Sequence, residues 1–311
     1  MTHSASLLTV TVASIEFQNP VILAAGTAAY GREIAGVMDL ESVGGIVTKA
    51  VSPEPRKGAP APRVAEFDGG MINAVGLANP GLASVLRDDI PWLAKNLIKP
   101  RVIVNVVGSS VDDFVTVTAA FAEVNTADAM ELNVSCPNVK AGGAEFGADS
   151  DTLRSLVSRC RSVTKRPLFV KLSPMLPNIA DTACIAVDAG ADGLTLVNTI
   201  PGLAIDVESR RPALGFGSGG ISGAGLLPVG VLAVWKVSRA VNVPLIGVGG
   251  ITKGTDVVQY LLAGASLAGL GTAALRDPRS PARIVGELSK WCESHGVKSV
   301  SEIVGRLEWP S

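Results

Sequence analysis

The chain has 311 residues, of which 47% are hydrophobic and 18% are charged, and its formal net charge is −1. This composition suits one large globular domain or two small ones, and the near-neutral charge gives no electrostatic case for nucleic acid or a lipid surface as a partner. No apolar run approaches the roughly 18 residues of a membrane span, and the first residues lack the basic and apolar regions of a signal peptide.

A small β-hairpin is predicted at the start of the chain, where residues 8–12 alternate apolar and threonine side chains and residues 15–17 follow. Eight short apolar runs come after it. Most are apolar throughout, as expected for parallel strands that are buried on both faces. The eight predicted strands are 21–24, 45–48, 102–107, 129–134, 168–172, 193–197, 245–248 and 266–270.

Helical patterns lie between several of these runs, at 111–124, 152–163, 179–188, 227–241 and 255–262. Strands and helices that alternate until eight strands are reached indicate an α/β fold, the (β/α)8 TIM barrel. No shift in composition marks a second domain, so we expect a single domain over residues 1–311. A doubly wound sheet is the alternative, although its crossovers would need more even helices.

Two long insertions interrupt the regular spacing of the predicted barrel. About fifty residues separate the second and third strands, with prolines at 53, 55, 60 and 62, and residues 201–225 follow the sixth strand. Long loops inside a compact domain are usually functional, and we expect both at the C-terminal face of the barrel. In the second insertion, the glycines of 215–220 predict a flexible loop, and Ser222 and Gly223 are candidate contacts for a phosphate or cofactor.

Small or polar residues follow the predicted strands, at the end where a TIM barrel has its active site. Each could be a capping residue or a surface group by itself, but a register shared by all eight strands predicts a ligand site. In chain order these residues are Ala25, Lys49, Asn105, Asn133, Lys171, Asn198, Thr199, Gly249, Gly250, Gly271 and Thr272.

The last two of these loops are rich in glycine, and each can lead into a helix. Their backbone N–H groups therefore predict a site for the phosphate of a ligand or cofactor. Residues 269–274 also match the dinucleotide pattern G-x-G-x-x-A. That match comes too late in the chain for a βαβ unit, and Asp277 follows too soon to bind a ribose, so we reject NAD binding there.

The segment 131–143 places a thiol, Cys136, just past the fourth predicted strand and between the amides of Asn133 and Asn138. A structural cysteine would normally lie inside the apolar run, so this position predicts a functional thiol. The alternative is a loop cysteine without a role.

Histidine is nearly absent, since the only two are His3 and His295, far from any motif. An enzyme with this sequence is therefore not expected to use histidine for proton transfer. The four cysteines are too far apart in sequence for the close pairs of zinc or iron–sulfur sites. This spacing predicts no metal site and suits a reduced, cytoplasmic protein.

Together these residues resemble the class 1 dihydroorotate dehydrogenases. The segment Asn73-Ala-Val-Gly-Leu77-Ala-Asn79-Pro-Gly81 is similar to the family's substrate loop, and Leu132-Asn133-Val-Ser-Cys136-Pro-Asn138 is similar to its catalytic loop. Cysteine at the catalytic position is typical of class 1, because class 2 has serine there and an N-terminal helical extension that we expect this chain to lack. Val47-Thr-Lys49-Ala-Val51 and Pro55-Arg56-Lys57-Gly58 are similar to class 1B, the NAD-linked catalytic subunits.

The resemblance implies one FMN per chain in the mouth of the barrel, with dihydroorotate or orotate beside it. The implied FMN contacts are Ala25, Lys49, Ala50, Asn105, Asn133, Lys171, Val197, Gly223, Gly249, Gly250, Gly271 and Thr272. The implied orotate contacts are Lys49, Asn73, Ala74, Val75, Gly76, Leu77, Asn133, Asn198 and Thr199. The family often has serine where Ala25 stands, so we expect one side-chain contact to be missing.

The implied activity is oxidation of dihydroorotate to orotate in de novo pyrimidine biosynthesis, with Cys136 as the base for the C5 proton and FMN as the acceptor of the C6 hydride. Lys171, on a rigid strand, suits stabilisation of the negative charge on reduced flavin. The chain offers no second redox site. The class 1B resemblance therefore implies a partner subunit that carries FAD and a 2Fe-2S cluster and passes electrons to NAD, in a heterotetramer around a homodimer.

Three alternatives stay open from the sequence. A class 1A enzyme would be linked to fumarate instead of NAD. Another FMN barrel could act on a different pyrimidine, such as dihydrouracil. A non-catalytic barrel that binds FMN or a phosphate is the rival from a different class, although it would have no reason to place a thiol opposite its ligand.

Overall fold

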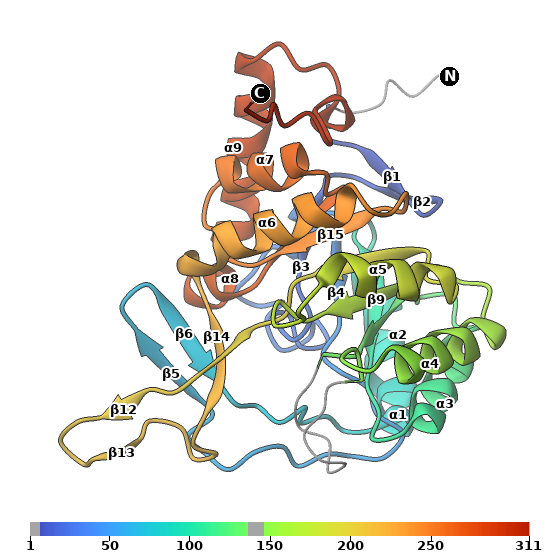
Figure 1. Ribbon diagram of the computed structural model, residues 1–311, viewed down its shortest axis with the longest axis vertical. Coiled ribbons are helices and arrows are strands. Elements are labelled where there is room, and N and C mark those ends of the chain that lie inside the picture. Colours follow the sequence, from blue (N-terminus) through green and yellow to red (C-terminus); the bar gives the residue numbers. More distant parts are fainter. Residues whose placement is uncertain (1–6, 136–145, 311) are drawn as a thin grey trace.

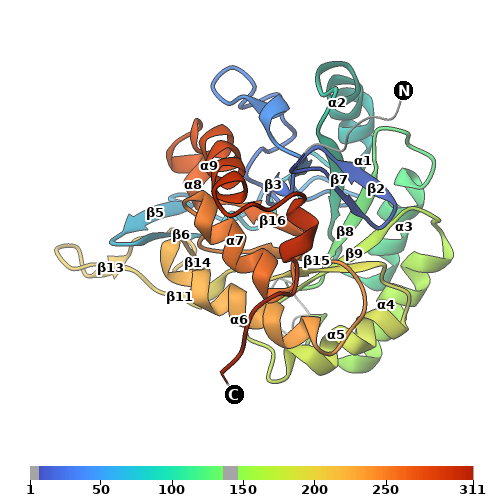
Figure 2. The same cartoon turned by 90° about the horizontal axis from the view of Figure 1, so that it is seen from above.

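Eight parallel strands close into a barrel at the centre of the computed structural model, which describes residues 7–135 and 146–310 (Figure 1; Figure 2). Their order around the barrel is β10-β15-β16-β3-β4-β7-β8-β9, so the first and last barrel strands in the chain, β3 and β16, lie side by side. The strands are β3 Val21–Leu23, β4 Gly45–Val47, β7 Arg101–Val106, β8 Ala129–Asn133, β9 Leu168–Leu172, β10 Gly193–Leu196, β15 Leu245–Val248 and β16 Leu267–Leu270.

Nearly all residues of these strands are buried, which explains why most of them are apolar. One face of each strand packs inside the barrel, and the other face packs against the surrounding helices. All eight predicted strands are found, so the TIM barrel is confirmed and the doubly wound sheet is excluded.

The helices lie outside the strands (Figure 2). Three of them begin with a side chain that accepts a hydrogen bond from a backbone N–H of the first turn: Ser110 before α3, Asp149 before α4 and Asn178 before α5. The five predicted helices correspond to α3 Val111–Phe121, α4 Ser150–Ser162, α5 Ile179–Asp188, α6 Leu227–Ser238 and α7 Gly254–Ala263.

Several helical segments were not predicted. A helical run over 82–96 precedes β7, and further helices follow β16. These segments are α1 Leu82–Ser84, a π-helical turn Val85–Asp89, α2 Ile90–Asn96, α8 Thr272–Arg276, α9 Ser280–Ser294 and a final 3-10 turn Val300–Ile303. Between β3 and β4 the structure has only a 3-10 turn, Leu40–Ser42, so the first unit of the barrel carries no α-helix.

The predicted hairpin consists of β1 Val10–Val12 and β2 Ile15–Phe17. It lies at the N-terminal end of the barrel strands, because the guanidinium of Arg101, the first residue of β7, donates a 2.7 Å hydrogen bond to the carbonyl of Glu16. The hairpin is therefore at the end of the barrel away from the predicted site. None of the helices that the structure describes is both long and apolar enough to cross a membrane.

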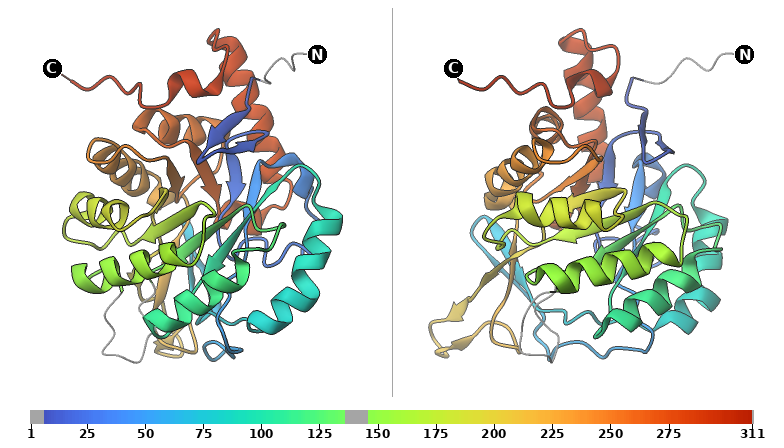
Figure 3. Two further views of the ribbon diagram at one scale, coloured as in Figure 1. Left: turned by 90° about the vertical axis from the view of Figure 1, so that its right-hand side faces the viewer. Right: turned by 45° about the vertical axis from the view of Figure 1, so that its right-hand side comes forward.

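The two insertions meet at the other end of the barrel and form one antiparallel sheet in the order β11-β14-β6-β5. Figure 3 shows this sheet and the projecting β12–β13 hairpin at the opposite end of the molecule from α9. The first insertion supplies β5 Val64–Phe67 and β6 Gly70–Asn73. The second supplies β11 Ile200–Gly202, β12 Ile205–Asp206, β13 Arg211–Pro212 and β14 Gly219–Ser222.

The prediction of a flexible loop over 215–220 is wrong for its last two residues, because Gly219 and Gly220 belong to β14. The glycines are needed for close packing here. A Cβ at Gly220 would lie 2.1 Å from the hydroxyl oxygen of Thr199, on the facing strand connection. In this segment glycine allows β14 to pack closely against its neighbours. A glycine-rich strand of this kind has the same sequence pattern as a flexible loop, so the sequence alone could not distinguish the two.

Candidate functional site

A cavity of about 800 Å³ lies between the C-terminal ends of the barrel strands and the inserted sheet. Every predicted site residue within the described ranges lines it. These are Ala25, Lys49, Ala50, Asn73, Ala74, Val75, Gly76, Leu77, Asn105, Asn133, Lys171, Val197, Asn198, Thr199, Gly223, Gly249, Gly250, Gly271 and Thr272. The predicted base, Cys136, lies outside the described residues, and Ser135, which precedes it in the sequence, lines the cavity.

Two lysines contribute positive charge to this cavity. Lys171 is only 6% exposed and stands on β9, in register with Asn133 of β8 and Thr195 of β10. Within residues 7–135 and 146–310, neither Lys171 nor Lys49 has a hydrogen bond or ion pair through its ammonium group. A buried ammonium without a partner is costly, so the cavity suits an anionic or electron-rich ligand.

Amide and hydroxyl groups form a second feature of the cavity wall. The Nδ2 of Asn198 donates to Ser135 Oγ at 2.7 Å and to Asn133 Oδ1 at 3.4 Å. The hydroxyl of Ser135 also donates to Asn133 Oδ1 at 3.3 Å. The oxygen of Asn198 accepts a 2.8 Å hydrogen bond from the backbone N–H of Thr199, which fixes the orientation of the amide. This group presents both donors and acceptors, as a ligand with amide edges requires.

Glycines at three strand and helix junctions form a third feature, which we call the glycine cradle: Gly223, Gly249, Gly250 and Gly271, with Thr272. Gly223 has a φ of +119°, and a Cβ there would lie 2.5 Å from the Cα of Gly70. The hydroxyl of Thr272 donates a 2.8 Å hydrogen bond to Ser222 Oγ beside it. Backbone N–H groups exposed at such turns suit the oxygens of a phosphate.

The structure also reveals a buried acid that the sequence analysis missed, Glu131 in the middle of β8. Its carboxylate is 1% exposed and accepts two hydrogen bonds of 2.7 Å, from Asn105 Nδ2 and from Thr195 Oγ1. Only Asn105 of these three lines the cavity. In the sequence, Glu131 lies inside an apolar strand, and its charge in that position was the signal that could have identified it.

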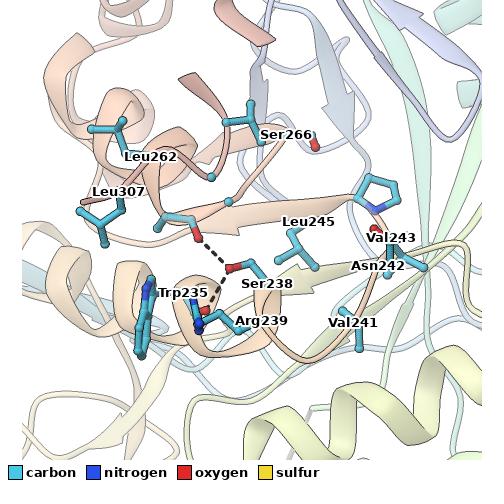
Figure 4. Close-up of a pocket in the computed structure, with 15 residues that line it drawn as sticks. Trp235, Ser238, Arg239, Val241, Asn242, Val243, Leu245, Leu262, Ser266 and Leu307 are labelled. Carbon is cyan, nitrogen blue, oxygen red and sulfur yellow. Dashed lines mark hydrogen bonds between the residues drawn. The ribbon is translucent and has the colours of Figure 1, made fainter. Parts of the chain in front are cut away.

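A second cavity, of about 430 Å³, lies near the start of β15, at the other end of the barrel (Figure 4). Arg239 is the only ionisable residue among those that line it. The hydroxyl of Ser238 is already paired, because it donates to the carbonyls of Trp235 and Ala263 at 2.9 Å each. The active sites of TIM-barrel enzymes lie at the opposite face, and this cavity offers no comparable set of polar groups.

The described cysteines do not take part in the site. Cys160 and Cys292 are buried, and Cys184 is half-buried on α5. Burial raises the pKa of the Cys160 thiol to about 11, so this group remains protonated at neutral pH. Within the described part of the chain, no group of three or more His, Cys, Asp or Glu residues could hold a metal ion.

Comparisons with a family model and with individual proteins all identify the same enzyme family. A family model described as dihydroorotate dehydrogenase matches residues 7–291. A protein of Pelobacter propionicus is 45% identical over 301 residues, which cover 97% of this chain and 98% of the relative. A protein of Bacillus pumilus is 43% identical over 300 residues, or 96% of both chains, and one of Geobacter sulfurreducens is 40% identical over 301 residues, or 97% and 98%. All three are named dihydroorotate dehydrogenase B (NAD(+)), catalytic subunit.

Proposed function

We propose that this chain, which belongs to the dihydroorotate dehydrogenase family, oxidises dihydroorotate to orotate in pyrimidine biosynthesis. The observation that carries the proposal is that one cavity at the active-site end of the barrel contains two lysines without a partner among the described residues, an amide cluster and the glycine cradle. Relatives at 40–45% identity that bear this enzyme's name support the same activity.

The substrate is a pyrimidine ring with two amide edges and a carboxylate. Asn133, Asn198 and Asn73 supply the donors and acceptors that such edges need, and all three line the cavity. Lys49 is a suitable partner for the carboxylate, because its ammonium has no other partner in the described ranges. The backbone of residues 74–77 and the Thr199 side chain complete the proposed substrate contacts.

The residues of the cavity fit FMN as the cofactor. The volume of about 800 Å³ falls within the range of small-molecule sites. The glycine cradle suits the phosphate group, and Ala25, Ala50, Asn105, Asn133, Lys171 and Val197 would line the remainder. When bound, FMN supplies an acceptor for the hydride from C6 of dihydroorotate. Lys171 would hold a fixed positive charge beside the ring system, where it favours the reduced, negatively charged form.

We assign Cys136 as the base that removes the C5 proton of dihydroorotate. The assignment rests on its position in the sequence, directly after Ser135 of the cavity wall. Of the two histidines, His295 does not line the cavity, and His3 lies outside the described residues. A cysteine acts as a base only as its thiolate, and positive charge in the cavity, from Lys49 and Lys171, favours the thiolate.

The electrons that FMN takes from dihydroorotate must pass to a further acceptor before the next turnover. The relatives are named catalytic subunits of an NAD(+)-linked enzyme, which supports a partner subunit and NAD as the final acceptor rather than fumarate. We propose that the partner carries FAD and a 2Fe-2S cluster and that a homodimer of this chain binds two partner subunits in a heterotetramer.

The test is to mix the flavin-loaded protein with dihydroorotate without oxygen and to follow the flavin absorbance. Bleaching by dihydroorotate but not by dihydrouracil is the expected result, and no bleaching would show that the proposed activity is wrong. A second assay follows NAD reduction. The chain alone should reduce artificial dyes but not NAD, and addition of the FAD and iron–sulfur subunit should establish NAD reduction. Rapid turnover of the chain alone with fumarate would favour the class 1A alternative.

A further inference from the structure

The carboxylate of Glu131 connects two strands that are not neighbours in the barrel. It stands on β8 and accepts hydrogen bonds from Asn105 on β7 and from Thr195 on β10, and β9 lies between β8 and β10. All three side chains are 1% exposed. None of the described lysines and arginines forms an ion pair with Glu131, so its charge is compensated mainly by these two hydrogen bonds.

This contact determines which atom Asn105 presents to the cavity. An ionised carboxylate can only accept hydrogen bonds, so the amide nitrogen of Asn105 must face Glu131. The amide oxygen, Oδ1, then accepts no hydrogen bond from a described residue, and Asn105 lines the cavity, so this oxygen is available to a ligand. A ligand that covers this oxygen and donates an N–H to it satisfies the acceptor, whereas a ligand that covers it without donating leaves the acceptor unpaired.

We propose that Glu131 is a positioning residue that acts through Asn105 and makes this point of the cavity selective for a ligand N–H. It does so by holding the Asn105 amide with its oxygen toward the ligand. The shared ligand chemistry is an imide N–H between two carbonyl groups, which occurs in the flavin ring at N3 and in orotate at N3. The identity of these two ligands rests on the proposed function, whereas the direction of the amide rests on the geometry alone.

The measurement is the ratio of dissociation constants for each parent ligand and its N3-methyl derivative. FMN and 3-methyl-FMN are titrated into the full-length chain freed of flavin, and orotate and 3-methylorotate are titrated into the FMN-loaded protein. The wild-type protein should bind one parent ligand roughly 10- to 100-fold more tightly than its methyl derivative, since a buried acceptor loses its donor. The ligand that shows this ratio is the one that contacts Asn105.

Glu131→Gln is the decisive variant. A glutamine can donate as well as accept, so the Asn105 amide can rotate and exchange the positions of its nitrogen and oxygen. The ratio of dissociation constants for that ligand and its methyl derivative should then fall toward one. Thr195→Val is the matched control, because it removes the other hydrogen bond of the same carboxylate and leaves the Asn105 contact in place. An unchanged ratio in Glu131→Gln would overturn the inference, and so would an equal loss in Thr195→Val.

The exchanged pair Glu131→Gln with Asn105→Asp provides a test that does not depend on the single variant's folding. It keeps one amide and one carboxylate in contact, and the amide of residue 131 then donates to the carboxylate at 105, which again turns an acceptor toward the cavity. In this double variant the ratio should return toward the wild-type value. A double variant that folds and binds the ligand but keeps a ratio near one would overturn the inference. If the wild-type protein binds neither FMN nor orotate, the proposed function is wrong and the inference falls with it.

Discussion

The hydroxyl of Thr272 donates a 2.8 Å hydrogen bond to the hydroxyl of Ser222, which joins the start of α8 to the end of β14. Ser222 in turn donates to the carbonyl of Met71 in β6 at 3.3 Å. The glycine cradle is thus built from the loops after β15 and β16 and from the second insertion, and Met71 and Gly70 of the first insertion pack against it. Its geometry depends on how the inserted sheet sits on the barrel, and not on the barrel alone.

Gly223→Ala should therefore weaken FMN binding and destabilise the fold. The residue has a φ of +119°, and the new Cβ would lie 2.5 Å from the Cα of Gly70. We expect a loss of about 1–3 kcal/mol in the free energy of unfolding. We also expect the dissociation constant of FMN to rise at least about tenfold. Thermal unfolding and a fluorescence titration with FMN measure the two effects.

Gly225→Ala is the control for this prediction, because no atom lies within 4 Å of a Cβ at Gly225. It should change the free energy of unfolding by no more than about 0.5 kcal/mol. Equal effects of the two substitutions would show that the fit of Gly223 against the inserted sheet does not matter.

Lys171→Ala should make the bound flavin harder to reduce. The ammonium is buried beside the cavity, and its charge matters most when the flavin carries negative charge. The midpoint potential should become more negative by about 30 mV, equivalent to about 1.4 kcal/mol for a two-electron couple. Orotate affinity should change less. Potentiometry and an orotate titration measure the two.

Lys165→Ala is the matched control, because Lys165 is exposed just before the same strand. Its flavin potential should equal that of the wild type. If Lys171→Ala instead keeps the potential and loses orotate binding, Lys171 belongs with the substrate contacts.

Cys136→Ser should keep FMN and orotate binding and lose most dihydroorotate oxidation near neutral pH. A hydroxyl is a much weaker base than a thiolate, and loss of a general base costs roughly 10²–10⁴-fold in rate. Activity should recover in part at high pH, where hydroxide can replace the base. The measurement is single-turnover flavin reduction over a range of pH. Cys184→Ser is the control, because Cys184 lies on α5 outside the cavity, and its rate should equal that of the wild type. A Cys136→Ser rate equal to the wild-type rate at neutral pH would exclude Cys136 as the base.

The stability of the fold should fall in alkaline solution partly through Cys160. Burial raises the pKa of this thiol from 9.0 to about 11. As the pH rises from 9 to 11, the unfolded chain releases the Cys160 proton before the folded chain does, so the folded state loses stability across this window. Cys160→Ala should reduce the slope of unfolding free energy against pH. Denaturant unfolding at several pH values measures this slope, and parallel curves for the two proteins would contradict the prediction.

The sequence by itself determined the barrel and most of the candidate site. Parallel strands buried on both faces are mostly apolar, so runs such as 168–172 and 245–248 can be recognised locally in the sequence. The residue just after each strand then lies at the active-site end whatever the detailed packing, because all the strands run in the same direction. Lys49, Asn198 and the glycines of the last two loops could therefore be placed together without coordinates.

Only the tertiary structure decided how the two insertions pair and which buried residues contact Asn105 of the cavity wall. β6 and β14 form one ladder, with Asn73 opposite Gly220, although they are far apart in the chain. A strand pairing of this kind depends on the register of two remote segments, which neither segment encodes alone. The same holds for Glu131, whose partners Asn105 and Thr195 come from two other strands. Closure of the barrel brings the three side chains together. The two hydrogen bonds that result satisfy the carboxylate of Glu131 and allow it to be buried within an apolar strand.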